Sequence, residues 1–143
     1  MPEFKCAKGR IVESLQFISG EIKEFDEDYA SKKWEDYAKD KKLQKLMDQT
    51  VENILTVLIE VSGTVLTQED IPIESYAQVL SECAKKFGFS EKEQEELSKL
   101  AIQRNRLAHR YLNFRWQAVN MFVKLKPLVL RLLEKILARE EGE

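Results

Sequence analysis

The stretch from Asp40 to Leu66 constrains the fold more than any other part of the sequence. Its apolar residues recur every three or four positions, which predicts one long helix. The central stripe is Leu43, Met47, Thr50, Ile54, Val57 and Val61, and Leu46, Val51, Leu55, Leu58 and Val65 widen it. A helix that is apolar over so much of its surface must be covered by other helices. The sequence therefore predicts a helical bundle built around this segment.

Four more segments show helical periodicity. They are predicted at residues 7–29 with fraying onward to 37, at 74–87, from 90 into 104–111, and from 113 or 114 to 138. The residues expected to face inward are Ile11, Leu15, Ile18, Ile22, Phe25 and Tyr29 in the first segment, Tyr76, Val79, Leu80 and Cys83 in the second, Leu97, Leu100, Ala101, Leu107 and Ala108 in the third, and Trp116, Val119, Phe122, Val123, Val129, Leu130, Leu133 and Leu137 in the last. Gly88 is a natural stop for the short helix, and Ser90 with Glu93 forms a capping box that starts the next one. Pro127 is expected to kink the last helix, and the polar tail 139–143 is expected to fray.

The composition agrees with a fold made of helices alone. The chain has 143 residues, only five glycines and three prolines, and 43% hydrophobic residues, with no alternating pattern that predicts a strand. This length is that of one domain with a substantial core. We expect a single all-α domain over residues 1–143, an antiparallel up-and-down four-helix bundle with one shorter additional helix.

The two cysteines and the N-terminus indicate the compartment. Cys6 and Cys83 have no metal-binding spacing, so we expect two reduced thiols and no metal site. The first residues lack the apolar stretch of a signal peptide, and no apolar run approaches the ~18 residues of a membrane span. These features predict a soluble cytoplasmic protein.

The net charge of −2 conceals a strong asymmetry along the chain. The basic residues of the span from Leu97 to Leu133 are Lys99, Arg104, Arg106, Arg110, Arg115, Lys124, Lys126 and Arg131. This span holds no Asp or Glu, so it carries +8 and the rest of the chain carries −10. Such a division indicates a basic surface for an anionic partner such as nucleic acid. The alternative is that these cations are scattered over the solvated faces of two helices.

The segment RNRLAHRY, residues 104–111, holds the residues that carry chemistry. His109 is the only histidine of the chain, and its type of side chain exchanges protons near neutral pH. Arg104 stays charged and can grip a phosphate. With no carboxylate in the segment, this set suits metal-free cleavage of RNA, in which His109 handles a proton and Arg104 stabilises the phosphoryl oxygens. The alternative is a surface segment whose arginines favour the C-terminal end of a helix dipole.

An ideal helix does not aim Arg104 and His109 at one point, because their side chains would diverge by about 140°. Either the helix breaks near His109 or the site combines residues of two chains. Asn105 lies one turn before His109 and would orient it. The neighbouring cations Arg106, Arg110 and Arg115 are candidates for RNA binding. Trp34, Tyr37 and Trp116 could stack on bases, although packing inside the protein is the commoner role of such residues.

The segment RNRLAHRY resembles the Arg–Asn–x–x–x–His–x–Tyr signature of HEPN-domain proteins, in particular of the HepT toxin type. The resemblance extends over most of the chain, with a long first helix, the apolar second helix and a long last helix. It implies a metal-independent RNase toxin that needs no cofactor. It also implies a homodimer with motif residues of both chains in one cleft, where Arg104 and His109 are catalytic and Asn105 supports His109.

The resemblance further implies a nucleotidyltransferase antitoxin that transfers AMP to Tyr111 and silences the RNase. An anionic adduct beside the catalytic arginine would occupy the phosphate site. The chain departs from the family pattern at Ala108, where a larger aliphatic residue is common, and at Arg115, where an acidic residue is common. Glu60 matches a position where relatives often carry Glu, and we expect a structural role for it. The alternative function is a non-catalytic HEPN subunit that binds nucleotide or serves as the substrate-binding partner of a nucleotidyltransferase.

Overall fold

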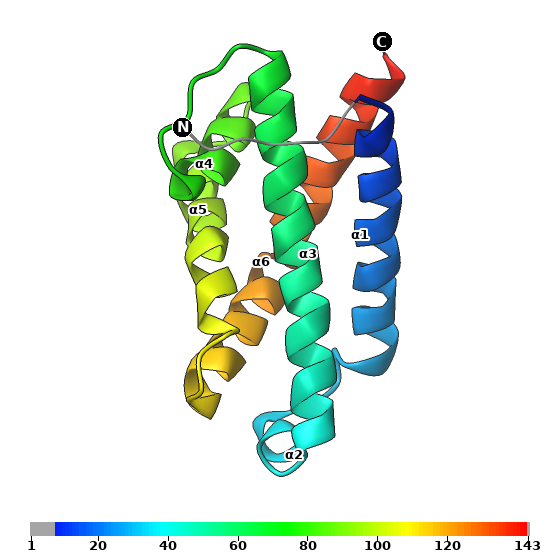
Figure 1. The fold of residues 1–143 in the computed structure, drawn as a ribbon, viewed down its shortest axis with the longest axis vertical. Helices are drawn as coiled ribbons and strands as arrows, with labels where there is room; N and C mark the ends of the chain where they lie inside the picture. Colours follow the sequence, from blue (N-terminus) through cyan, green and yellow to red (C-terminus); the bar gives the residue numbers. More distant parts are fainter. Residues whose placement is uncertain (1–7, 143) are drawn as a thin grey trace.

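The computed structural model describes residues 8–142, and within this range every regular element is a helix. The elements are α1 (Lys8–Asp28), α2 (Trp34–Ala38), α3 (Lys41–Gln68), α4 (Tyr76–Lys86), α5 (Glu91–Arg106) and α6 (Leu112–Glu141). The long helices α1, α3, α5 and α6 alternate in direction, and the short α4 lies beside one end of α5 (Figure 1). The predicted all-α up-and-down bundle with a shorter inserted helix is therefore confirmed. The predicted start at Ala7 lies outside the described residues.

Helix α3 is the central element, as its sequence pattern predicts. It packs against α1, α4, α5 and α6, and α6 crosses behind it in the view of Figure 1. Its buried apolar residues include Met47, Val51, Ile54, Leu55, Leu58, Val61 and Val65. By length and composition α3 could also cross a membrane, but 67% of its most apolar stretch is buried by the other helices. Such burial is typical of the core helix of a bundle.

The predicted core face is right for α1 and partly wrong elsewhere. Every member of the α1 stripe is buried: Ile11, Leu15, Ile18, Ile22, Phe25 and Tyr29. Six residues predicted to face inward are exposed instead: Leu46, Tyr76, Ala108, Val123, Leu130 and Leu137. On α6 the buried residues include Leu125, Leu132 and Ile136. The apolar side of α6 is wider than the surface that the neighbouring helices cover. The spacing of its apolar residues therefore could not predict which of them are buried and which are exposed.

The segment between α1 and α3 contains a short helix where the sequence predicts only the end of a helix and a turn. Tyr37 on α2 is fully buried, and its hydroxyl donates to Oδ1 of Asp48 on α3 at 2.7 Å. The rings of Trp34 and Trp116 lie 6.0 Å apart, and Tyr37 lies 4.9 Å from Trp116. This cluster joins α2 to α6 by packing, which is the commoner of the two roles considered for these aromatic residues.

The helix ends agree with the caps predicted around Gly88. Gly88 has a φ of +83°, a left-handed conformation that other residues rarely adopt. The capping box is complete, because the Ser90 hydroxyl accepts from the Glu93 amide at 3.2 Å and Glu93 accepts from the Ser90 amide at 2.9 Å. These two features set the hairpin between α4 and α5, and therefore the line along which α5 runs toward residues 104–111.

The end of α6 differs from the prediction. Helix α6 ends at Glu141 rather than at residue 138, so residues 139–141 are helical and not frayed, while the kink at Pro127, which lies inside the helix, stays a prediction. Arg139 pairs with Glu140 and with Glu69 at the end of α3, the latter at 3.1 Å. Glu69 also accepts from Lys86 at 2.8 Å. These ion pairs anchor the last turn of α6 to the α3–α4 connection, a contact between residues 70 positions apart that no local pattern reveals.

Candidate active site

The segment 104–111 lies at a break between two helices. Helix α5 ends at Arg106 and α6 begins at Leu112. In the turn, the amides of Ala108 and His109 donate to carbonyl oxygens three residues earlier, which tightens the chain as it leaves the helix. Leu107 is 5% exposed and anchors this turn to the core. One of the two predicted solutions is thus found, because the helix breaks just before His109.

His109 is exposed and is held by its neighbours in the turn. Its Nδ1 accepts a hydrogen bond from the backbone amide of Tyr111 at 3.1 Å. A ring nitrogen that accepts carries no proton, so the neutral ring of His109 has its proton on Nε2. The ring lies 4.9 Å from that of Tyr111 and 4.9 Å from that of Phe114, the second contact edge-on. The ring orientation is therefore set by one backbone bond and two aromatic neighbours.

Tyr111 presents its hydroxyl to solvent beside a cation. The residue is 50% exposed, and the guanidinium of Arg110 donates to its hydroxyl oxygen at 3.2 Å. The same guanidinium lies 5.1 Å from the centre of the Tyr111 ring. A phosphate attached to this hydroxyl would lie beside Arg110, whose planar donors suit phosphate oxygens.

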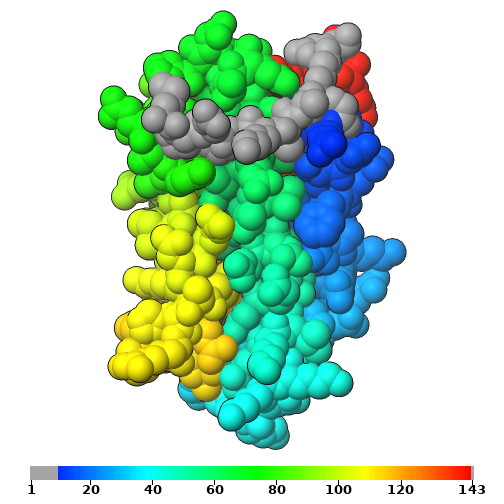
Figure 2. Space-filling view, in the orientation of Figure 1, coloured from blue at the N-terminus to red at the C-terminus, as the bar shows by residue number. Residues whose placement is uncertain are grey.

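Arg104 is held from a different direction. Its Nε donates to the hydroxyl of Thr56 on α3 at 3.0 Å, and its two terminal nitrogens have no hydrogen-bond partner among residues 8–142. The end of α5 lies beside α3 on the face shown in Figure 2. Within the described part of one chain, no hydrogen bond or ring contact joins Arg104 to His109.

The predicted role of Asn105 is not seen in a single chain. Asn105 is exposed, and no hydrogen bond joins it to His109 among the residues that the structure describes. The backbone amide of Tyr111 orients the imidazole instead. Two residues that contribute to the site were not predicted from the sequence. Thr56 carries no local signal, while Phe114 lies in the same short segment and could have been found.

Arg115 differs from its predicted role as an RNA-binding cation. It forms an ion pair with Asp48 at 2.7 Å, and only 19% and 11% of the two side chains are exposed. Burial raises the pKa of Asp48, an effect opposed by hydrogen bonds from Tyr37 and Arg115. The Asp48 carboxylate neutralises the cation, so Arg115 ties the first turn of α6 to α3 rather than adding charge to the surface.

The basic surface is smaller than the sequence indicates. Three of the eight cations form ion pairs, namely Arg115 with Asp48, Lys126 with Asp26 and Arg131 with Glu93. The other five have no ion pair within the described range 8–142: Lys99, Arg104, Arg106, Arg110 and Lys124. All five lie on α5, on the turn or in the first half of α6. Of these five, Arg106 and Arg110 lie within three residues of His109.

The described residues contain neither a metal-binding cluster nor an exposed cysteine. Residues 8–142 contain no cluster of three His, Cys, Asp or Glu side chains suited to a metal ion. Cys83 is fully buried, and burial raises its pKa to about 12, so it packs as a small apolar side chain as predicted. Cys6 lies outside the described residues.

Comparison with known protein families gives a match over most of the sequence. The family model described as "Ribonuclease HepT-like" matches residues 18–135, from the middle of α1 into the last turns of α6. The chain belongs to the HepT-like ribonuclease family. The matched range includes the whole of RNRLAHRY, and the family is the one that the segment resembles. No curated protein matches this HepT-like chain.

Proposed function

We propose that this HepT-like chain is a metal-independent endoribonuclease toxin, with His109 and Arg104 as its catalytic residues. The carrying observation is the exposed His109 at the helix break, oriented by the Tyr111 amide and flanked in sequence by Arg106 and Arg110, which have no ion pair within residues 8–142. Its family and its charge both favour an RNA substrate.

The proposed reaction needs one attack and two proton movements. The 2′-oxygen of a ribose forms a bond to the adjacent phosphorus, and the bond from phosphorus to the 5′-oxygen of the next nucleotide breaks. The 2′-hydroxyl loses a proton and the 5′-oxygen gains one; His109 carries one of these two protons and water carries the other. The terminal nitrogens of Arg104 stabilise the negative charge that gathers on the phosphoryl oxygens.

We further propose that the working site forms in a homodimer. Thr56 holds Arg104 against α3, whereas the His109 ring is held by Tyr111 and Phe114 in the turn. A cleft between two copies would allow Arg104 of one to act with His109 of the other, and would give Asn105 a partner. Sedimentation of wild type should show a dimer. Mixing His109→Ala and Arg104→Ala proteins should restore cleavage if the two residues act across chains.

Regulation is proposed to act on Tyr111. A nucleotidyltransferase partner would join the Tyr111 oxygen to the α-phosphorus of ATP, with loss of the phenolic proton and departure of pyrophosphate. The exposed hydroxyl and its contact with Arg110 support this acceptor role. The adduct would place a phosphate and a base next to His109, where they would exclude RNA.

The test is incubation of purified protein with RNA in the presence of EDTA, after mass spectrometry shows Tyr111 to be unmodified. The wild type should cleave, and His109→Ala and Arg104→Ala should not. The second candidate is a non-catalytic subunit that binds nucleotide or serves a nucleotidyltransferase. It is favoured by the lack of contact between Arg104 and His109 within one chain. An unmodified wild type that binds nucleotide and leaves RNA intact would establish it.

A further inference from the structure

A groove of about 320 Å³ lies between the last turn of α5 and the first half of α6, the two helices on either side of the break. Its lining residues are Gln103, Arg106, Gln117, Asn120, Met121 and Lys124. No carboxylate is among them. The volume is at the lower end of the range of about 300–1,000 Å³ for small-ligand sites, so one nucleotide would fill it.

The cations of the groove connect it to His109. Arg106 donates to Oε1 of Gln117 at 3.1 Å, and its guanidinium lies 5.8 Å from the centre of the Phe114 ring. That ring packs edge-on against His109. Lys124 lies about three turns further along α6 than Phe114 and has no ion pair within residues 8–142. A line of positive charge therefore extends from the catalytic turn along the groove.

The floor of the groove contains an unpaired polar group. Gln103 is 6% exposed, and its Oε1 has no hydrogen-bond partner among the described residues. A buried acceptor without a partner is energetically unfavourable, because it has lost its hydrogen bonds to water. The terminal torsion of a glutamine is soft, so a rotation of the amide would bring its oxygen or nitrogen to a ligand in the groove. Met121 adds an apolar wall suited to the face of a base.

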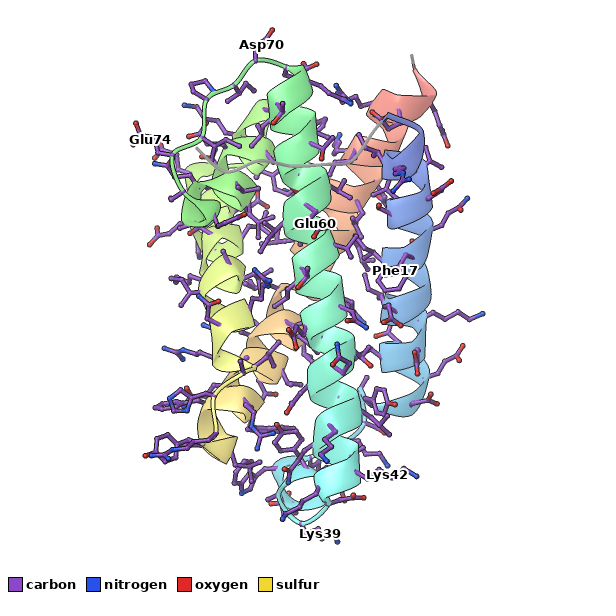
Figure 3. The ribbon with its side chains drawn as sticks, viewed as in Figure 1. Phe17, Lys39, Lys42, Glu60, Asp70 and Glu74 are labelled. Atoms are coloured by element: carbon purple, nitrogen blue, oxygen red, sulfur yellow. The ribbon has the colours of Figure 1, made fainter. Side chains whose placement is uncertain are left out.

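A second hollow, of about 310 Å³, differs from the α5–α6 groove in the charge of its lining. It lies between α1 and α3 and is lined by Glu13, Ser14, Phe17, Val57 and Glu60. Phe17 and Glu60 are labelled on these two helices in Figure 3. Its two carboxylates would repel a phosphate. Of the two hollows, only the α5–α6 groove combines cations with uncharged polar groups.

We propose that the α5–α6 groove is a nucleotide subsite for the RNA strand beside the cleaved phosphate, which extends the ribonuclease function proposed above. Lys124 and Arg106 each contact a phosphate of the strand, and the side-chain amide of Gln103 pairs with the edge of the base. Single-stranded RNA offers such unstacked bases to proteins. The subsite would therefore bias cleavage toward particular bases next to the broken bond.

The test measures binding without relying on cleavage. The probe is a short fluorescein-labelled 2′-O-methyl RNA, which lacks the attacking hydroxyl, and binding is followed by fluorescence anisotropy. Lys124→Glu should weaken binding about tenfold and reduce the salt dependence by about one phosphate contact. Lys135→Glu is the matched control, because Lys135 is an exposed lysine on the same helix without an ion pair in the described range. It should change affinity less than about twofold.

A second variant tests the floor of the groove. Gln103→Leu should weaken binding and reduce the preference among homopolymer probes, while the melting temperature stays equal or rises because a buried unpaired acceptor is removed. AMP alone is titrated in parallel to separate a strand subsite from a site for free nucleotide. Equal effects of Lys124→Glu and Lys135→Glu would overturn the proposal. So would AMP binding that depends on Lys124 together with RNA binding that does not.

The two proposals can fail separately. If wild type cleaves RNA and Lys124→Glu binds as the control does, the groove is not a subsite and the ribonuclease function stands. If the groove binds RNA but unmodified wild type does not cleave, the subsite survives and the catalytic function is wrong.

Discussion

Replacing Thr56 by valine should slow RNA cleavage by removing a hydrogen bond that positions Arg104. The Thr56 hydroxyl accepts from Nε of Arg104 at 3.0 Å, and it is the hydrogen bond that holds this guanidinium against α3. Valine keeps the shape and β-branching of threonine, so the packing of α3 should change little. Without the bond, the long Arg104 side chain would sample other rotamers and meet the phosphate less often.

The size of the effect follows from the chemistry of the bond. A hydrogen bond with a charged partner contributes about 1.5–3 kcal/mol. If that energy serves to position Arg104, its loss should lower kcat/KM by about 10- to 150-fold, since 1.36 kcal/mol corresponds to tenfold. The assay is initial-rate cleavage of a fluorogenic RNA in EDTA, with circular dichroism to show that the variant is folded.

Two controls separate positioning from general damage. Thr56→Ser keeps the hydroxyl and should cleave within about threefold of wild type. The double variant Thr56→Val with Arg104→Ala should be no slower than Arg104→Ala alone, because Thr56 acts only through that arginine. Wild-type rates in folded Thr56→Val, or additive losses in the double variant, would refute the positioning role.

Three further predictions concern stability and the core. Asp48→Asn should lower the free energy of unfolding by about 2–4 kcal/mol in urea titrations, because it leaves a largely buried guanidinium without its counter-charge; a change below 0.5 kcal/mol would contradict this. Hydrogen bonds from Lys86, and to a smaller extent from Arg139, hold the pKa of Glu69 below its usual value. The ionised Glu69 side chain therefore stabilises the fold above about pH 4.3, and this contribution is lost as the pH falls below that value. Glu69→Gln should therefore show a smaller acid-side fall in Tm than wild type. With Cys6 replaced by alanine, Cys83 should react with a thiol reagent only on unfolding, and fast reaction in the native state would contradict its burial.

The helices were predictable because their signals are local. The α1 stripe, the α3 core face and the Ser90 capping box each lie within a few turns of chain. The break before His109 was only one of two possibilities left by the angle between Arg104 and His109, because the turn contains neither glycine nor proline to mark it. What sets its position in the fold is Leu107, which is buried and therefore turns the chain toward the core.

The contacts that complete the site could not be predicted, because they join distant parts of the chain. Thr56 meets Arg104 across 48 positions, and Asp48 meets Arg115 across 67. The sequence around Arg115 contains no acidic residue, but its partner Asp48 lies on another helix. Ion pairs between distant residues neutralise surface charge but leave no local sequence pattern. The sequence therefore could not show which of the eight cations are paired.

The most direct measurement is the cleavage of RNA in EDTA by wild type and by His109→Ala, with Tyr111 shown to be unmodified in both. A general acid or base contributes about 10²- to 10⁴-fold, so the wild type should cleave and His109→Ala should be at least a hundredfold slower while remaining folded. Equal cleavage by the two proteins would contradict the account, because the activity would then arise from residues other than the single histidine at the helix break.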